Sequence, residues 1–144
     1  MPYSKIWIHL IWSTKNREKI ITSSLKNSLL EHIISNAGTK GIHIDTINCV
    51  QDHIHIILSL GRDQTVSKVT QLIKGESSNW LNKNKLTKTK FEWQDEYIAV
   101  SISHSMIDKV REYVRNQEEH HRVKSFSEEY HNFVEKYEFE RNSG

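Results

Sequence analysis

The order of strand-like and helix-like segments restricts this chain to very few folds. Residues 3–13 are apolar on both parities, which is typical of a central strand covered on both faces. Residues 42–50 and 53–60 alternate as two further strands, and the short polar turn between them predicts an antiparallel hairpin. A fourth strand is predicted at about residues 97–103.

Apolar residues at helical spacing predict helices between and after these strands. The first helix is expected to begin at a cap formed by Ser23 or Ser24 and to end at Gly38. Thr65 opens the second helix. The segment Ser-Met-Ile-Asp fits a capping pattern and opens a third helix over about residues 105–121.

The resulting order, β-α-β-β-α-β, predicts an α+β fold of the ferredoxin-like type with an antiparallel sheet. In that plan the first and third strands are central, and two helices cover one face of the sheet. The 144 residues fit a single domain, 1–144, with a core over about 3–121. A last helix, from about Ser127, is expected to dock on this core over about 125–138.

Composition narrows the class of protein. The net charge is only +2, so any nucleic-acid surface must be local. One cysteine, Cys49, excludes an internal disulfide framework and fits a reducing compartment. The sequence has no run of about 18 apolar residues, and its N-terminal segment is typical of a strand rather than a signal peptide. We therefore expect a cytoplasmic protein without a membrane partner.

The third predicted strand carries a His-x-His pair. Side chains alternate along a strand, so His53 and His55 point to the face opposite the apolar row. Their Cα atoms are expected about 7 Å apart, from a rise of roughly 3.3 Å per residue, and both rings can reach one divalent ion. The alternative is a pair of hydrogen-bonded histidines on a half-exposed face, and a metal site also requires a third ligand.

The third predicted helix offers such a ligand. Tyr113 and Gln117 are four residues apart and therefore share a face at the rim of the apolar stripe. Gln117 can give a neutral amide oxygen to a metal, and Tyr113 presents a phenol one turn away. The alternative is a boundary tyrosine followed by a solvated glutamine.

Three motifs, taken together and in order, resemble those of one enzyme family. They are DHIH at 52–55, WQDEYIAVS at 93–101 and YVRNQEEHH at 113–121. This combination resembles the single-tyrosine HUH transposases of the insertion-sequence 200/605 family, whose relatives include the REP-associated tyrosine transposases. The resemblance runs from Tyr3 to about Phe133. One departure is Glu96, which stands where these proteins commonly carry glycine.

The resemblance implies a bacterial homodimer that cleaves and rejoins single-stranded DNA beside a hairpin through a 5′-phosphotyrosine. It implies no small-molecule substrate and an association with the nucleoid when DNA is bound. By position, His53, His55 and Gln117 match the metal ligands and Tyr113 matches the nucleophile. It also favours a shared site, in which the third helix brings Tyr113 to the histidines of the second subunit.

The chemistry of this reaction agrees with these residue types. A cation held by two neutral imidazoles and an amide keeps its charge to offset that of a phosphodiester. Mg²⁺ is the expected ion, with Mn²⁺ as a substitute. A phosphotyrosine conserves bond energy, so a DNA 3′-hydroxyl can attack it without ATP.

Cationic residues outside the site predict contacts with the DNA backbone. They are Lys83, Lys85, Lys88 and Lys90 around a polar loop, and Arg115 on the third helix. Trp80, Phe91 and Trp93 flank the loop and are candidates for stacking on unpaired bases, with core packing as the alternative for Trp80.

Two other functions are compatible with parts of this pattern. One is a non-catalytic ferredoxin-like nucleic-acid-binding protein, such as a domesticated transposase, which binds DNA without forming an adduct. The other is a metal-storage or metal-sensing protein that uses the two histidines and ignores DNA.

Overall fold

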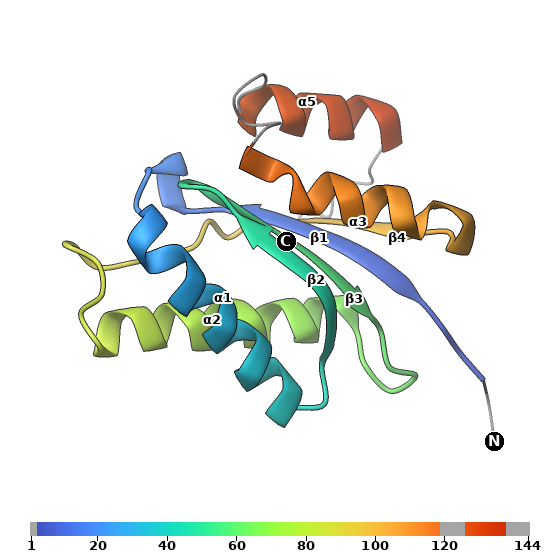
Figure 1. Cartoon of the computed structure of the whole chain (residues 1–144), viewed down its shortest axis with the longest axis horizontal. Helices are drawn as coiled ribbons and strands as arrows, with labels where there is room; N and C mark the ends of the chain where they lie inside the picture. Colours follow the sequence, from blue (N-terminus) through green and yellow to red (C-terminus); the bar gives the residue numbers. More distant parts are fainter. Residues whose placement is uncertain (1–2, 119–125, 138–144) are drawn as a thin grey trace.

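The sheet of the computed structural model has four antiparallel strands in the order β2-β3-β1-β4. The structure describes residues 3–118 and 126–137 (Figure 1). The strands are β1 (Trp7–Ser13), β2 (His43–Cys49), β3 (His53–Ser59) and β4 (Ile98–Ile102). The element order β-α-β-β-α-β is confirmed, and β1 and β3 occupy the centre as predicted. The first strand begins at Trp7 rather than near residue 3.

Two helices, α1 (Ser23–Thr39) and α2 (Val66–Lys83), cover one face of the sheet (Figure 1). Their apolar stripes meet the inward rows of the strands in the main core. Thr65 caps α2 as predicted, because its hydroxyl accepts from the Lys68 N–H at 3.2 Å. The predicted serine cap of α1 is wrong. Thr22 accepts from the Leu25 N–H at 3.3 Å, so the helix is capped one residue earlier.

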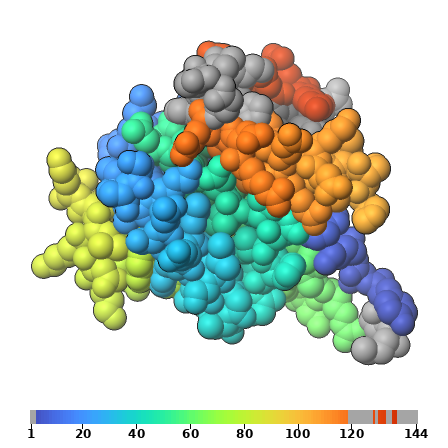
Figure 2. All heavy atoms as spheres, viewed as in Figure 1, coloured from blue at the N-terminus to red at the C-terminus, as the bar shows by residue number. Residues whose placement is uncertain are grey.

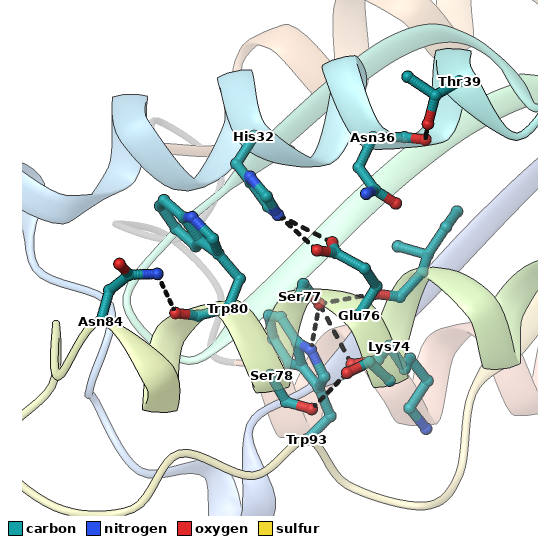
Figure 3. Close-up of polar contacts among 12 residues, drawn as sticks. His32, Asn36, Thr39, Lys74, Glu76, Ser77, Ser78, Trp80, Asn84 and Trp93 are labelled. Atoms are coloured by element: carbon teal, nitrogen blue, oxygen red, sulfur yellow. Dashed lines mark hydrogen bonds and ion pairs between the residues drawn. The ribbon is translucent and has the colours of Figure 1, made fainter.

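A polar contact joins α1 to α2, and another ties the segment after the following loop to α2 (Figure 3). The ring of His32 lies 2.8 Å from both Glu76 oxygens and stacks on Trp80 at a centroid distance of 4.1 Å. Trp93 donates to the Ser77 hydroxyl at 2.8 Å. Phe91 and Trp93 are both buried, and Trp80 is half-buried. Stacking of Phe91 and Trp93 on DNA bases is therefore wrong, since both rings pack in the core.

The opposite face carries α3 (Ile107–Arg115) and α5 (Phe126–Tyr137), which Figure 1 shows on the far side of the sheet from α1 and α2. The predicted capping pattern of the third helix is wrong. A 3-10 turn (His104–Met106) leads directly into α3, and the Ser105 hydroxyl lies 3.1 Å from that of Ser103 instead of capping the helix. The predicted continuation of this helix to about residue 121 is wrong, because α3 ends at Arg115 with Asn116 as its C-cap. Residues 119–121 lie outside the described ranges.

A second, smaller core lies between α3 and the sheet. It contains Trp7, Ile57, Ile107 and Val114. The sheet is thus covered on both faces, as the apolar residues of both parities in β1 predicted. Within the described residues, no helix has the length and apolarity needed to cross a membrane.

Candidate active site

β3 presents two histidines on the face that α3 covers. Ile54, Ile56 and Leu58 point the other way, into the core beneath α1 and α2, as the alternation predicted. His53 and His55 are each 0% exposed. Their ring centroids are 5.1 Å apart. The two imidazoles therefore lie side by side in a position shielded from solvent.

The carboxylate of Asp52 determines which nitrogen of His53 carries a proton. Its Oδ1 lies 2.8 Å from Nδ1 of His53, in buried surroundings. An ionised carboxylate only accepts hydrogen bonds, so Nδ1–H of His53 is the donor. The lone pair of the neutral ring is then on Nε2, which is the arrangement that a metal-binding histidine needs.

His9, on the neighbouring strand β1, orients the second imidazole. Its Nε2 lies 2.9 Å from Nδ1 of His55, and both side chains are buried. When Nδ1–H of His55 donates to His9, the lone pair of His55 is on Nε2. No role for His9 or Asp52 was predicted from the sequence. The approach of His9 to His55 depends on the register of β1 and β3, in which Ile11, two residues from His9, pairs with His55.

Gln117, just beyond the end of α3, completes the candidate ligand set. It is 1% exposed, and its Oε1 lies 3.4 Å from Nε2 of His53. Its amide nitrogen donates to the Tyr113 carbonyl at 3.1 Å, which turns Oε1 toward the histidine. Two lone-pair atoms thus face each other. Their separation suits two ligands that each lie about 2.1 Å from one ion, so these residues fit a divalent cation.

Tyr113 lies beside the histidines and is half-buried. Its ring is edge-on to both imidazoles, with centroid distances of 5.8 Å to His55 and 6.3 Å to His9. The body of the ring packs against the small core beneath α3. The spacing of four residues therefore brings the phenol and the Gln117 amide to the same site.

Contacts made by Arg111, Asn48 and Lys26 hold α3 and the residues just after it over this face. Two guanidinium nitrogens of Arg111 each lie 2.8 Å from a carboxylate oxygen of Asp45 in β2. Asn48 donates to two backbone carbonyls at the end of α3, at 2.9 and 3.1 Å, and Lys26 pairs with Glu118 at 2.8 Å. The hydrogen bond from Arg111 holds the pKa of Asp45 below its usual value. The ion pair therefore contributes fully at neutral pH, and its contribution is lost only as the pH falls through that lowered pKa.

These contacts place α3 over the histidines of its own chain. We expected the helix to reach the second subunit, yet His53, His55, Gln117 and Tyr113 meet here within one chain. The reason is that α3 finds its contacts far away in the sequence but within the same chain. Asp45, which pairs with Arg111, and the apolar cluster beneath α3 both belong to that chain. A shared site requires α3 to leave this face, and it stays a prediction.

The described residues contain no alternative metal site built from histidine, cysteine and carboxylate side chains. Within residues 3–118 and 126–137, no group of three or more His, Cys, Asp or Glu side chains is arranged to hold a metal. The candidate set differs in composition, because its third member is an amide. Cys49 is fully buried, as expected of a core residue, and burial raises the pKa of its thiol to about 12.

The predicted DNA-binding cations are all exposed. Lys83 ends α2, the residues Lys85, Lys88 and Lys90 lie in the loop that follows, and Arg115 ends α3. Figure 2 shows the yellow segment of the chain, which contains this loop, projecting from the body of the molecule. Lys85 has a positive φ of 52°, which turns the chain directly after α2. Contact of these side chains with DNA stays a prediction.

Comparisons with known protein families and with individual proteins agree on one family. The chain matches the family model described as "Transposase IS200 like" over residues 2–117. It is 24% identical over 115 residues to the ISDra2 transposase TnpA of Deinococcus radiodurans, covering 76% of this chain and 81% of that protein.

Two solved structures share the fold. One, from Deinococcus radiodurans R1 and described as a candidate transposase, has a TM-score of 0.66 and 20% identity and covers 81% of this chain and 93% of the other. The second is a REP-associated tyrosine transposase bound to a REP hairpin, with a TM-score of 0.65 and 17% identity, covering 84% of this chain and 72% of the other. Since the family model spans most of its length, this chain belongs to the IS200-like transposase family.

Proposed function

We propose that this protein is a metal-dependent transposase that cuts and rejoins single-stranded DNA through a 5′-phosphotyrosine on Tyr113. The observation that carries the proposal is the buried meeting of His53, His55 and Gln117 beside the Tyr113 ring. The test uses single strands copied from the DNA that flanks the gene. With Mg²⁺ or Mn²⁺ present, the purified protein should form an adduct with them that survives denaturation.

The covalent step conserves one phosphodiester-type bond. The Tyr113 oxygen forms a bond to the scissile phosphorus, and the bond from phosphorus to the 3′ oxygen breaks. The phenol proton leaves the tyrosine, and the departing 3′ oxygen gains one. In the reverse direction a 3′-hydroxyl from another DNA end attacks the phosphotyrosine and restores the phenol. Rejoining therefore needs no ATP, and hydrolysis is not required.

The ligand set supports a divalent ion, Mg²⁺ or Mn²⁺, held by Nε2 of His53, Nε2 of His55 and Oε1 of Gln117. When bound, such an ion supplies positive charge that offsets the charge developing on the scissile phosphate. An ion on Nε2 of each ring requires the tautomers in which Nδ1–H of His53 donates to Asp52 and Nδ1–H of His55 donates to His9, and both pairs lie within hydrogen-bonding distance.

The remaining features belong to the same proposal. The central positions of β1 and β3, with two helices on one face, support the ferredoxin-like assignment. The REP-associated relative is bound to a DNA hairpin, which supports a hairpin beside the cleavage site here. A single nucleophilic tyrosine at each site, Tyr113, supports a homodimer, because two strand cleavages then require two chains. We place this reaction in the bacterial cytoplasm.

Replacing His9 by leucine is expected to lower Mn²⁺ affinity about 10–100-fold, because Nδ1–H of His55 loses its acceptor. Titration calorimetry without DNA measures this directly. His9→Gln offers an amide oxygen in place of the ring nitrogen and should recover part of the affinity. Recovery of this kind distinguishes a positioning role from simple core packing.

The matched control for His9 is Val100→Ala. Val100 pairs with His9 across β1 and β4. The substitution therefore removes side-chain volume from the same face of the sheet and leaves the contact between His9 and His55 in place. Its Mn²⁺ affinity should equal that of the native chain. Unchanged Mn²⁺ affinity in His9→Leu would show that His9 does not contribute to the metal site.

Replacing Lys83, Lys85, Lys88 and Lys90 together by glutamine is expected to weaken binding of single-stranded DNA. For every DNA phosphate that these lysines neutralise in the native chain, the slope of log affinity against log salt should become shallower by about 0.7. Fluorescence anisotropy at several salt concentrations measures that slope. An unchanged slope would show that these exposed lysines are only solvated. As a control, Lys5→Gln, Lys19→Gln, Lys40→Gln and Lys109→Gln remove four other exposed charges.

A further inference from the structure

A cavity of about 340 Å³ lies beside the candidate active site, on the same face of the sheet. We call it the β1–β4 cavity, because the paired residues Ile11 of β1 and Ile98 of β4 both line it. Ile11 pairs across the strands with His55, and Ser13, which also lines the cavity, pairs with His53. Opposed Cα atoms in such pairs are about 4.5–5.5 Å apart. A nucleotide in this cavity would therefore be an immediate neighbour of a phosphate at the histidines.

The lining of the β1–β4 cavity combines flat rings with hydrogen-bonding groups. Tyr97 and Tyr130 contribute phenol rings, and Tyr130 comes from α5, on the α3 side of the sheet. The Arg17 guanidinium lies 5.8 Å from the centroid of the Tyr130 ring, within the range of a cation–π contact. Gln94 and Glu96 add an amide and a carboxylate. The cavity thus offers faces for stacking and edges for hydrogen bonding.

The backbone at the cavity wall has an uncommon conformation. Asn16 and Arg17 are consecutive residues with positive φ, 59° and 54°, and both line the cavity. The Asn16 N–H donates to the Gln94 side chain at 3.4 Å. Non-glycine residues in this region persist where the surrounding structure determines them, and they cluster at ligand sites. The wall is therefore shaped by contacts between two distant segments of the chain.

This lining matches a nucleobase better than a phosphate. The Glu96 carboxylate would repel a phosphate group in this cavity. A base presents N–H groups, and the carboxylate can accept hydrogen bonds from them. Glu96 is exposed, and its φ is not positive, so a side chain at this position brings no left-handed strain. The two tyrosine rings can stack on any base, and stacking alone does not select a sequence. Selection in this cavity therefore falls to its hydrogen-bonding side chains, among which Glu96 supplies the carboxylate.

We propose that the β1–β4 cavity binds the unpaired nucleobase next to the scissile phosphate. In this proposal Glu96 favours bases that carry an exocyclic amino group over thymine, whose single ring donor, N3–H, lies between two carbonyl oxygens that a carboxylate repels. Cytosine, adenine and guanine each present such a group. The position of the cavity beside the cut rests on the proposed function, whereas base binding by itself does not.

The experiment uses the full chain in EDTA, so that no cleavage occurs. The probes are a labelled twelve-residue oligothymidylate and three versions with one central dC, dA or dG. Anisotropy should show the substituted strands binding about tenfold more tightly than oligothymidylate, as a hydrogen bond to a charged group allows. Glu96→Gln should reduce this preference to less than about threefold. Asp95→Asn removes the same charge one residue away, outside the cavity lining, and should keep the preference.

Two further measurements locate the base. Tyr97→Leu removes one ring and should weaken binding of all four strands about tenfold. A strand with one 5-iodo-deoxycytidine, irradiated with the native chain, should cross-link to Tyr97 or Tyr130 by peptide mapping. This measurement does not depend on any variant that fails to fold.

The outcomes separate this proposal from the proposed function. Equal binding of all four strands by the native chain, absence of binding, or cross-links only outside the cavity lining would overturn the base site. A covalent adduct on Tyr113 with no base preference would support the transposase reaction and refute the cavity. A Glu96-dependent preference with cross-links in the cavity, but no adduct, would do the reverse.

Discussion

Tyr113→Phe should bind single-stranded DNA as tightly as the native chain and form no covalent adduct. We expect the adduct yield to fall by at least about a thousandfold, because only the nucleophilic oxygen is removed. The phenylalanine ring keeps the edge-on contacts with His55 and His9, so the site should keep its shape. Anisotropy measures binding, and denaturing gel electrophoresis with a labelled strand measures the adduct.

Tyr3→Phe is the matched control for this variant. Tyr3 is 98% exposed at the start of the described chain, far in sequence from the candidate site, so its loss of a hydroxyl should leave the adduct yield unchanged. Peptide mapping of the native adduct identifies the attached tyrosine. Attachment of DNA to Tyr97 or Tyr130 would show that the nucleophile has been misassigned.

His53→Ala and His55→Ala should each abolish cleavage and lower Mn²⁺ affinity by more than about a hundredfold. This loss exceeds the 10–100-fold expected for a residue that only orients a ligand. Gln117→Ala should have a smaller effect, because a neutral amide is the weakest of the three ligands. Titration calorimetry gives the affinities, and an adduct assay with Mn²⁺ gives the cleavage rates.

Loss of folding must be separated from loss of the metal site, because both histidines are fully buried. Thermal unfolding without metal shows whether each variant is folded under assay conditions. His104→Ala removes an exposed histidine and should retain native Mn²⁺ affinity. A folded His53→Ala chain with native Mn²⁺ affinity would refute the proposed ligand set, though not the family.

Membership of the family does not depend on whether the site is shared. The structure shows one chain that brings its own tyrosine to its own histidines, held by the ion pair between Asp45 and Arg111. If α3 exchanges between subunits, this partly buried pair must separate and form again with the partner. Breaking a partly buried bidentate pair leaves two charges poorly compensated. The exchange would therefore be slow compared with side-chain motion.

Local periodicity in the sequence determined the architecture and the faces of its elements. Alternation along β3 placed His53 and His55 opposite the apolar row, whatever the rest of the chain does. The four-residue spacing predicted that Tyr113 and Gln117 lie on one side, and they do, although α3 ends at Arg115 and Gln117 lies just beyond it. Both inferences succeed because a side chain's direction within a strand or helix depends only on its position along that element.

Contacts between elements distant in sequence decided the rest. His9 reaches His55 only because β1 and β3 are neighbours in a particular register, and α3 covers its own chain because Arg111 finds Asp45 in β2. Phe91 and Trp93 pack in the core because the loop after α2 folds back onto the helix. Such pairings depend on register and on the whole packing of the domain. No local pattern of residues contains that information, so only the tertiary structure could determine them.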